Sequence, residues 1–408
     1  MEQILWPDLE GKRILLAVTG GIAAYKAADL CRLLRRCGAG VNVMMTAAAR
    51  RFVGEVTFAA LSDEPVSVDL FDPQQEAQIG HIGLADAADL LLVAPATANM
   101  LAKLCHGVAD DLVSTVYLAY CGPVLLAPAM NVNMWQHAAT RDNVERLRGR
   151  GHRFVGPDSG DLACGHVGAG RMAEPVEILQ AAGVCLGPGD LSGRTVLVTA
   201  GPTHEPIDPV RYVGNRSSGR MGFALAAEAL SRGARTLLVA GPTGLPTPLG
   251  AERTSVTTAA EMSAAAGDLV GQADAALMAA AVADFRPATA SSTKLKKEAL
   301  GQEHALTLTR NEDILAGLGQ SERRPRVLVG FAAETGADAL ERSAPAKLRA
   351  KGCDLLVGND VSAGDAGFEV ETNRVVIFDR DGGNERLPLM SKRAAARRIL
   401  DRVVRLLG

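Results

Sequence analysis

The chain has 408 residues, which fits two or three domains, and each half is long enough to bury its own core. Its net charge of −3 and its aromatic content of 4% argue against a nucleic-acid binder, which needs a basic surface and stacking platforms. The seven cysteines include no CxxC pair, and no apolar run reaches the ~18 residues that span a bilayer. We therefore expect a cytoplasmic protein with reduced thiols and no membrane partner.

Short apolar runs alternate with helical patterns along the first half. Arg13–Thr19 is nearly all apolar, as expected for a strand covered on both faces, and a helix follows Gly20-Gly21. Further buried strands are predicted at Val41–Met45, Leu90–Ala94 and Val124–Ala127. This alternation predicts a parallel sheet with right-handed crossovers.

The pattern restarts after Gly183–Gly193, a stretch rich in glycine and proline that we interpret as a linker. The strands predicted beyond it are Arg194–Thr199, Ala273–Met278, Arg326–Phe331, Asp354–Val357 and, as an edge strand, Val375–Asp379. A final helix with one apolar face is expected to pack on the core. The sequence thus predicts an α/β protein of two doubly wound (Rossmann-like) domains with mainly parallel sheets, residues 1–188 and 189–408.

The segment TGGIAAYK puts Gly20 and Gly21 at the junction between a strand and a helix. Backbone amides at a helix N-terminus favour phosphate, and glycine lets a ligand approach closely. The spacing is not GxGxxG, and the second strand ends in Met45-Thr46 rather than in the acid that binds the ribose of NAD. FMN therefore fits better than NAD, although such a glycine turn also occurs in domains without a ligand.

Polar residues near later strand ends extend this candidate site. Thr97 and Asn99 follow a buried strand, where ligands bind in open sheets, whereas Asp110 and Asp111 are better explained as helix caps. Residues that a scaffold does not need are His81 before a helix, Asn131 in PAMNVNM, and Cys164 in the glycine-rich loop DLACGHVGAGRM. A thiol in such a loop is exposed enough to react. These three can converge above one sheet edge, although His81 taken alone is more typical of a surface or capping residue.

The second half has a candidate site of its own. Asn215–Gly219 (NRSSG) is a loop rich in donors at a helix start, which suits a phosphate or acyl phosphate as well as simple capping. Asp284 ends a buried strand, and Phe331 ends another, where it could pack on a base. Lysines that could neutralise a triphosphate, or could simply form solvated faces, are Lys294–Lys297, Lys347 and Lys351.

Several of these segments together carry a family resemblance. TGGIAAYK, APATAN, PAMNVNM and ACGHVGAGRM, with His81, resemble the flavin-containing cysteine decarboxylases. NRSSGRMG, AAAVADFR, KLKK and GFAAET resemble the bacterial, CTP-using phosphopantothenate–cysteine ligases. In this order they cover nearly the whole chain, which therefore resembles the bifunctional phosphopantothenoylcysteine decarboxylase and phosphopantothenate–cysteine ligase family of coenzyme A biosynthesis.

For the N-terminal half the resemblance implies a flavodoxin-like flavoprotein domain that decarboxylates 4′-phosphopantothenoylcysteine to 4′-phosphopantetheine. Transient oxidation of the substrate thiol by FMN would give the electrons left by CO2 a sink. His81 would handle protons near the thiol, Asn131 would bind the carboxylate, and Cys164 would donate the proton that lets the enethiol be reduced. The implied FMN ligands are Gly20, Gly21, Ile22, Thr46, Pro95, Thr97, Asn99, Ser114 and Met130. Family members place FMN at a trimer interface, so a homo-oligomer with trimeric flavin domains is expected.

For the C-terminal half the resemblance implies a ligase domain that joins 4′-phosphopantothenate to cysteine. CTP would activate the carboxylate as an acyl-cytidylate, releasing pyrophosphate, before the cysteine amine attacks. Asn215 would bind the acyl-cytidylate, and Lys294 would assist its conversion. Mg2+ would bridge the phosphates, and the sequence does not identify the protein ligands of this ion. The implied CTP contacts are Met278, Ala279, Ala280, Asp284, Asn311, Asp313, Ile314, Phe331, Lys347 and Lys351.

Two other functions remain open at this point. A flavoprotein acting on another cysteine-containing or prenyl substrate would explain the first half but not the second. A nucleotide-binding sensor without catalysis would need the glycine loops but not His81, Asn131 and Cys164.

Overall fold

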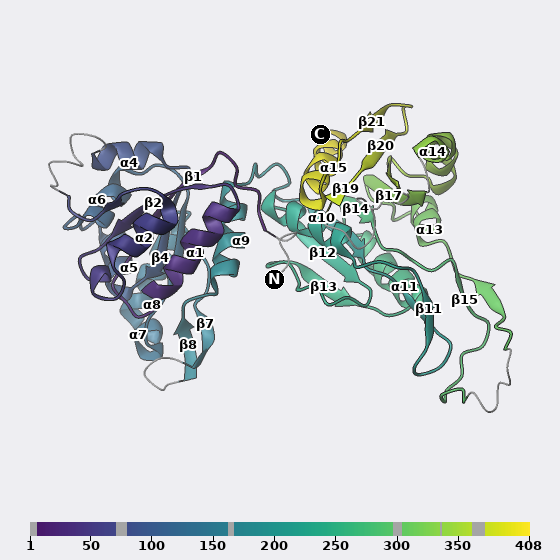
Figure 1. Cartoon of the computed structure of the whole chain (residues 1–408), viewed down its shortest axis with the longest axis horizontal. Helices are drawn as coiled ribbons and strands as arrows, with labels where there is room; N and C mark the ends of the chain where they lie inside the picture. Colours follow the sequence, from purple (N-terminus) through teal and green to yellow (C-terminus); the bar gives the residue numbers. More distant parts are fainter. Residues whose placement is uncertain (1–5, 71–79, 162–166, 297–303, 335–336, 361–371) are drawn as a thin grey trace. The chain divides into compact units, whose positions relative to one another are not determined.

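The computed structural model describes residues 6–70, 80–161, 167–296, 304–334, 337–360 and 372–408. Within these ranges the chain divides into two compact units, Trp6–Gly187 and Pro188–Gly408 (Figure 1). Both units are α/β with mainly parallel sheets, as the alternation of apolar runs and helical patterns predicts. None of the helices in these ranges has the length and apolar character needed to cross a membrane.

The N-terminal unit has a six-stranded parallel sheet in the order β3-β2-β1-β4-β5-β6. Its strands are β1 (Arg13–Val18), β2 (Gly40–Met45), β3 (Val66–Ser67), β4 (Leu90–Ala96), β5 (Val124–Pro128) and β6 (Arg153–Phe154), and β7 (Asp158–Asp161) and β8 (Val167–Arg171) form a separate hairpin. The strand order reverses between β1 and β4, and ligands of open α/β sheets bind at the carboxyl ends of strands at such a point.

The helices of this unit cover both faces of its sheet. They are α1 (Ala24–Arg36), the 3-10 helix η2 (Ala49–Arg51), α2 (Glu55–Ser62), α4 (His81–Ala87), α5 (Ala98–His106), α6 (Leu112–Ala119), α7 (Val132–Gln136), α8 (Ala138–Gly149) and α9 (Pro175–Leu186). Ile14 and Leu16 of β1 join the core under α1, α2 and α9, whereas Leu15 and Ala17 join the core under α4, α5, α6 and α8. Burial on both faces explains why β1 is apolar at nearly every position.

The predicted linker begins too early. Helix α9 continues to Leu186, so Gly183–Leu186 is helical rather than part of a linker. The glycine is there because the helix packs closely on the start of the unit: a Cβ at Gly183 would meet Pro7 Cβ at 2.5 Å. A glycine required by packing was thus mistaken for a chain breaker.

The C-terminal unit has an eight-stranded sheet in the order β13-β12-β9-β14-β17-β18-β20-β21, which is parallel as far as β18. Its strands are β9 (Thr195–Ala200), β12 (Arg235–Ala240), β13 (Glu252–Ser255), β14 (Ala275–Met278), β17 (Val327–Glu334), β18 (Leu355–Asp360), β20 (Val375–Asp379) and β21 (Asn384–Arg386). The prediction that Val375–Asp379 is an edge strand is wrong, because β21 pairs along its outer side. The short polar strand β21 carries no apolar pattern from which it could be predicted.

Helices again cover both faces of this sheet. They are α10 (Arg220–Ser231), α11 (Ala259–Val270), α13 (Ile314–Gln320), α14 (Ala337–Lys351) and α15 (Lys392–Leu407). The predicted core packing of the last helix is confirmed: Ile399, Leu400 and Val403 are fully buried in the core that α15 shares with α10. Short pairs of strands lie outside the large sheet: β10 (His204–Pro206) with β11 (Tyr212–Gly214), β15 (Phe285–Pro287) with β16 (Leu308–Arg310), and β19 (Thr372–Asn373) with β22 (Met390–Ser391).

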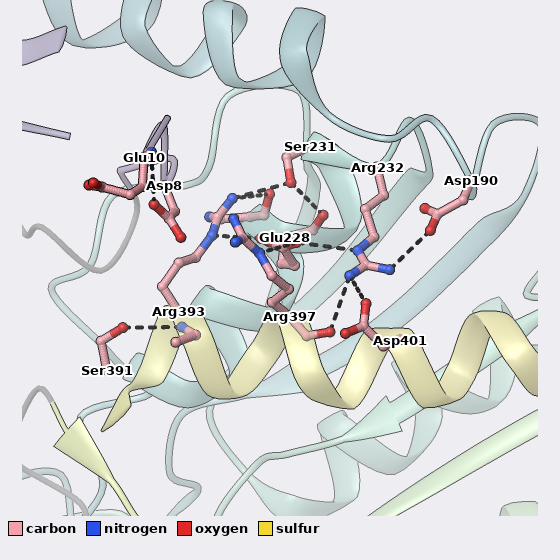
Figure 2. A network of polar contacts seen from close by, with 12 residues as sticks. Asp8, Glu10, Asp190, Glu228, Ser231, Arg232, Ser391, Arg393, Arg397 and Asp401 are labelled. Carbon is pink, nitrogen blue, oxygen red and sulfur yellow. Dashed lines mark hydrogen bonds and ion pairs between the residues drawn. The ribbon is translucent and has the colours of Figure 1, made fainter. Parts of the chain in front are cut away.

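A buried ionic network joins α10 to α15 (Figure 2). The Glu228 side chain, 4% exposed, pairs with Arg232 Nε at 3.2 Å and with Arg393 Nε at 2.9 Å. Arg232 also pairs with Asp190, before β9, at 3.1 Å and with Asp401 of α15. The network therefore links the start of the unit to its last helix, and a buried charge of this kind is tolerated only while its partners are present.

Candidate functional site

The N-terminal unit contains a cavity of about 870 Å³ at the carboxyl ends of β1, β2, β4 and β5. Thr19, directly after β1, donates its hydroxyl to the carbonyl of Pro95 in β4 at 2.7 Å. Thr97 caps α5 by accepting from the Met100 N–H at 3.3 Å, and its own N–H donates to Thr19 Oγ1 at 3.3 Å. These bonds tie together the two loops at the point where the strand order reverses.

Most residues predicted to bind FMN surround this cavity. Those that line it are Gly20, Gly21, Ile22, Thr46, Thr97, Asn99 and Met130. Pro95 and Ser114 are buried and are not among its lining residues in the described part of the chain. Their roles toward FMN, like those of the lining residues, stay predictions.

The three residues predicted to be catalytic are placed differently. Asn131 lines the cavity and caps α7, its Oδ1 accepting from the Asn133 N–H at 2.8 Å. His81 is the half-buried first residue of α4 and is not among the lining residues that the structure describes. Cys164 lies outside the described residues. The structure of one chain therefore brings Asn131, but not His81, to the predicted flavin site.

Charged side chains that were not predicted to belong to this site also line the cavity: Lys26, Lys103, Asp111 and Arg171. Lys26 is 7% exposed, and its Nζ donates to the carbonyl of Met172 at 3.2 Å and to Glu174 Oε1 at 2.9 Å. The Lys26 bond, with its charge, holds the pKa of Glu174 below its usual value. A signal for Lys26 did exist, since it interrupts the buried face of the helix that follows the glycine turn.

A second charged group sits at the start of α6. Lys103 Nζ lies 2.5 Å from Asp110 Oδ1 and 2.6 Å from Asp111 Oδ2. Asp111 also caps α6, its Oδ1 accepting from the Ser114 N–H at 2.8 Å, so the predicted capping role of this acid is confirmed. Burial by itself would raise the pKa of Asp111, but the bonds from Lys103 and Ser114 outweigh it and leave the pKa lowered. Asp111 is therefore ionised at neutral pH.

The cavity fits FMN in size and in chemistry. Its volume of about 870 Å³ lies within the range of small-molecule sites. Gly20, Gly21 and Ile22 lie just before the N-terminus of α1, where a phosphate is favoured. A side chain at position 20 is impossible here, because a Cβ on Gly20 would meet Ala48 Cβ at 2.4 Å. Hydroxyl and amide groups of Thr19, Thr97 and Asn99 supply polar contacts elsewhere on the wall.

The C-terminal unit has a smaller cavity of about 290 Å³ between the start of α10 and the chain that follows β14. Asn215 projects from the end of the β10–β11 hairpin, and its Nδ2 donates to the carbonyl of Val282 at 2.9 Å. Thr199 Oγ1 accepts from the Ala280 N–H at 3.3 Å, which fixes the same chain from the β9 side. One side chain from the end of the β10–β11 hairpin and one from β9 thus hold the segment that forms one wall of the cavity.

The structure brings only part of the predicted ligase residues to this cavity. Asn215, Ala279, Ala280, Asp284 and Phe331 line it. The predicted residues that are not among its described lining are Met278, Lys294, Asn311, Asp313, Ile314, Lys347 and Lys351. The roles of both groups stay predictions.

Several residues of the second group are nevertheless tied to the cavity rim or to each other. Asn311 Nδ2 donates to the carbonyl of Ala283 at 2.8 Å. Asp313 caps α13, its Oδ1 accepting from the Ala316 N–H at 3.0 Å, and it forms an ion pair with Lys351 of α14. Ile314 is 8% exposed and packs in the core, which favours a packing role for its side chain.

The sequence reasoning missed polar residues on the opposite wall. Arg220, Asn359, Asn373 and Lys392 line the cavity. Within the described part of the chain, Asn359 Oδ1 is buried without a hydrogen-bond partner, which is unusual for a buried polar atom. Asn359 follows the apolar part of β18, and polar residues at the carboxyl ends of parallel strands were the signal that could have found it.

Comparisons with known proteins match both units. Residues 5–183 match the family model described as Flavoprotein, and residues 191–407 match the DNA/pantothenate metabolism flavoprotein C-terminal domain. The coenzyme A biosynthesis bifunctional protein CoaBC of Vibrio vulnificus (strain YJ016) is 45% identical, covering 98% of this chain and 99% of the relative. The protein of the same name from Bacillus subtilis (strain 168) is 46% identical over 98% of both chains. A solved C-terminal domain of a CoaBC protein is 37% identical with a TM-score of 0.46, covering 54% of this chain and 98% of that chain.

Proposed function

Because this chain belongs to the family of bifunctional coenzyme A biosynthesis proteins, with a flavoprotein domain and a pantothenate-metabolism domain, we propose that its two units catalyse consecutive reactions. The C-terminal unit joins cysteine to 4′-phosphopantothenate through an acyl-cytidylate made from CTP. The N-terminal unit decarboxylates the resulting 4′-phosphopantothenoylcysteine to 4′-phosphopantetheine with FMN.

One observation supports this assignment above the others. Each unit has its own cavity at the carboxyl ends of a parallel sheet, and each cavity is lined by residues that the resemblance assigns to that reaction. In the N-terminal unit these include Gly20, Thr97 and Asn131, and in the C-terminal unit Asn215 and Asp284. A protein with a single nucleotide-binding activity would need only one of these two cavities.

In the N-terminal unit, residues after β1 and β4 would hold FMN, with its phosphate at Gly20, Gly21 and Ile22 and its polar edge near Thr97 and Asn99. FMN, when bound, supplies the reversible oxidation of the substrate thiol that gives decarboxylation an electron sink. The Asn131 side chain, beside the cavity, would bind the substrate carboxylate. His81 would take up the thiol proton, and Cys164 would return a proton to the product carbon chain.

In the C-terminal unit, a carboxylate oxygen of 4′-phosphopantothenate attacks the α-phosphorus of CTP, and the bond to pyrophosphate breaks. The cysteine amine then attacks the acyl carbon, the bond to CMP breaks, and the amine loses a proton. Asn215 would bind the acyl-cytidylate with its amide group, and Asp284 and Phe331 would bind the nucleotide. Lys294 would neutralise charge that develops on the phosphates, and Mg2+ brought in with CTP would supply further positive charge there.

We also propose a homo-oligomer in which the flavin units form trimers. Apolar side chains beside the flavin cavity are exposed in the single chain: Ile22 is 63% exposed and Tyr25 59%. Burial of these two side chains between copies would stabilise an assembly and would enclose the cavity. Light scattering of the purified chain should give the mass of a multimer, and a monomer that is active at low concentration would contradict the proposal.

The test is a reaction of the full chain, loaded with FMN, with 4′-phosphopantothenate, cysteine, CTP and Mg2+, followed by mass spectrometry. Formation of 4′-phosphopantetheine and CO2 that depends on both CTP and cysteine would support both activities. Accumulation of the cysteine adduct alone would support the ligase assignment and overturn the decarboxylase assignment. The N-terminal unit would then be a flavoprotein that acts on another substrate. No product from folded protein would favour a sensor without catalysis.

A further inference from the structure

The β10–β11 hairpin leaves the large sheet of the C-terminal unit and packs beside β15 (Figure 1). The turn of this hairpin contains Asp208, whose side chain is fully buried although the neighbouring Pro209 and Val210 are exposed. A buried carboxylate in an exposed turn needs partners that satisfy its charge. Those partners show what the turn does.

Five hydrogen bonds converge on the Asp208 carboxylate. Within the turn, the N–H groups of Val210 and Arg211 donate to Oδ1, both at 2.8 Å. The Arg211 guanidinium donates to Oδ2 through Nε at 3.0 Å and Nη2 at 2.6 Å. The fifth bond crosses the sequence: the N–H of Leu295, 87 residues away, donates to Oδ2 at 3.1 Å. Hydrogen bonds from Arg211 hold the pKa of Asp208 well below its usual range, so this carboxylate is ionised at neutral pH.

The ion pair of Asp208 and Arg211 forms hydrogen bonds with both backbone polar groups of Leu295. While Asp208 accepts from the Leu295 N–H, Arg211 Nη2 donates to the Leu295 carbonyl at 2.6 Å. The same turn holds the chain a little earlier, where the Ser291 N–H donates to the carbonyl of Ile207 at 2.9 Å. The backbone is thus fixed at two points, and Lys294 lies between them with an exposed side chain.

The other end of this hairpin carries Asn215, which is anchored to the cavity wall through the carbonyl of Val282. One small hairpin therefore connects the two residues to which the ligase reaction is assigned. We propose that Asp208 is a positioning residue for ligation, which fixes the backbone on which Lys294 reaches the phosphates. The inference rests on the proposed function, in which Lys294 neutralises charge that develops on the phosphates.

The physical reason lies in the entropy of the lysine. An exposed lysine side chain samples many rotamers, and a loose backbone would spread its ammonium group further. Fixing Leu295 removes the backbone part of that freedom before CTP arrives. Charge stabilisation depends strongly on position, and a displacement of about 1 Å can cost on the order of 100-fold in rate.

The experiment uses the full chain with the Asp208→Asn substitution. An asparagine is nearly the same size, but it cannot accept two bonds from Arg211 while holding Leu295. We expect kcat for pyrophosphate release in the complete reaction, with CTP, 4′-phosphopantothenate and cysteine all saturating, to fall about 10- to 100-fold. The KM for CTP should change less than about twofold, since this loss affects the chemical step more than binding. Decarboxylation of supplied 4′-phosphopantothenoylcysteine by the same preparation should be unchanged.

A double-mutant comparison separates positioning from general damage. If Asp208 acts through Lys294, adding Asp208→Asn to Lys294→Gln should not slow pyrophosphate release below the rate of Lys294→Gln alone. Glu252→Gln is the matched control, because Glu252 forms a two-point pair with Arg235, at 2.7 and 2.9 Å, on the exposed surface of the same unit. This control should behave as wild type.

A folded Asp208→Asn chain with wild-type kcat would overturn the inference, and so would a double variant slowed by the full factor of each change. If Asp208→Asn does not fold, Arg211→Lys keeps the charge and loses the planar two-point contact, and the same outcomes decide. Failure of the proposed function looks different. In that case the wild type releases no pyrophosphate, or Lys294→Gln has no effect, and the inference falls with it.

Discussion

The N-terminal cavity of about 870 Å³ is lined by loops that directly follow neighbouring strands, whereas the C-terminal cavity of about 290 Å³ gathers only part of its predicted residues. Gly20, Thr46 and Thr97 reach the first cavity because each follows a strand of the parallel sheet. Asn215 and Lys294 instead lie in segments outside the sheet. Hydrogen bonds of side chains such as Asp208 hold these segments in place. One site is therefore positioned by the sheet itself and the other by a few polar bonds.

Because the two sites are held in different ways, substitutions should affect them differently. Changes at polar ties of the C-terminal unit should impair one reaction without unfolding the chain. Changes inside a packed layer should cost stability whether or not they lie near a site.

The largest effect is expected for Asn215→Asp. The aspartate cannot donate to the carbonyl of Val282, now at 2.9 Å from Nδ2, and it places a negative charge where the acyl-cytidylate would bind. Loss of one hydrogen-bond donor to the reacting group costs roughly 100- to 1,000-fold in rate. Mass spectrometry of the combined reaction should show lost ligation, with decarboxylation of supplied 4′-phosphopantothenoylcysteine retained. Simultaneous loss of both activities in folded protein would break the two-site model.

A large effect on stability, rather than on one reaction, is expected for Glu228→Gln in the network of Figure 2. The substitution removes the carboxylate that Arg232 and Arg393 share in the interior, and breaking such a buried pair costs about 3–5 kcal/mol. Urea unfolding followed by a probe for each unit should show the C-terminal transition shifted and the N-terminal transition unchanged. The surface variant Glu252→Gln should shift neither, and an equal shift in both units would contradict the division into independent units.

A smaller effect separates two helix caps of similar geometry. Asp111 caps α6 beside the N-terminal cavity, and Thr258 caps α11 in the other unit, each with a capping box. Replacing either by alanine should cost about 1–2 kcal/mol of unfolding free energy. Only Asp111→Ala should also weaken FMN binding, measured by the recovery of flavin fluorescence on release, because it leaves Lys103 without one of its partners at the cavity wall. Equal flavin affinity in both variants would contradict a role for this cap in the site.

The two caps should also differ in how the stability cost of their substitution depends on pH. The pKa of Asp111 is lowered in the native state, so the native chain holds this proton less tightly than the unfolded chain does. Its contribution is therefore complete above about pH 4, the unfolded value, and is lost as the pH falls through the lower native pKa. The cost of Asp111→Asn, measured by urea unfolding, should shrink between pH 7 and about pH 3. The cost of Thr258→Ala should stay constant, because threonine does not titrate.

Much of the fold followed from local patterns in the sequence. Arg13–Thr19 and Arg194–Thr199 predicted β1 and β9 because strands buried on both faces are apolar at nearly every position. The glycine turn at Gly20 and the polar residues after β4 and β5 predicted much of the lining of the first cavity, since chain order and a parallel sheet together bring strand ends to one edge.

The tertiary structure decided what no local pattern records. The bond between Asp208 and Leu295 joins residues 87 positions apart, the pair of Lys351 with Asp313 joins two helices, and β21 covers the strand expected at the edge. Hydrophobic periodicity reports how deeply a segment is buried, because every residue of the segment contributes to it. A polar contact depends on two side chains whose types are compatible with many partners, so only the folded chain selects which partner each of them has.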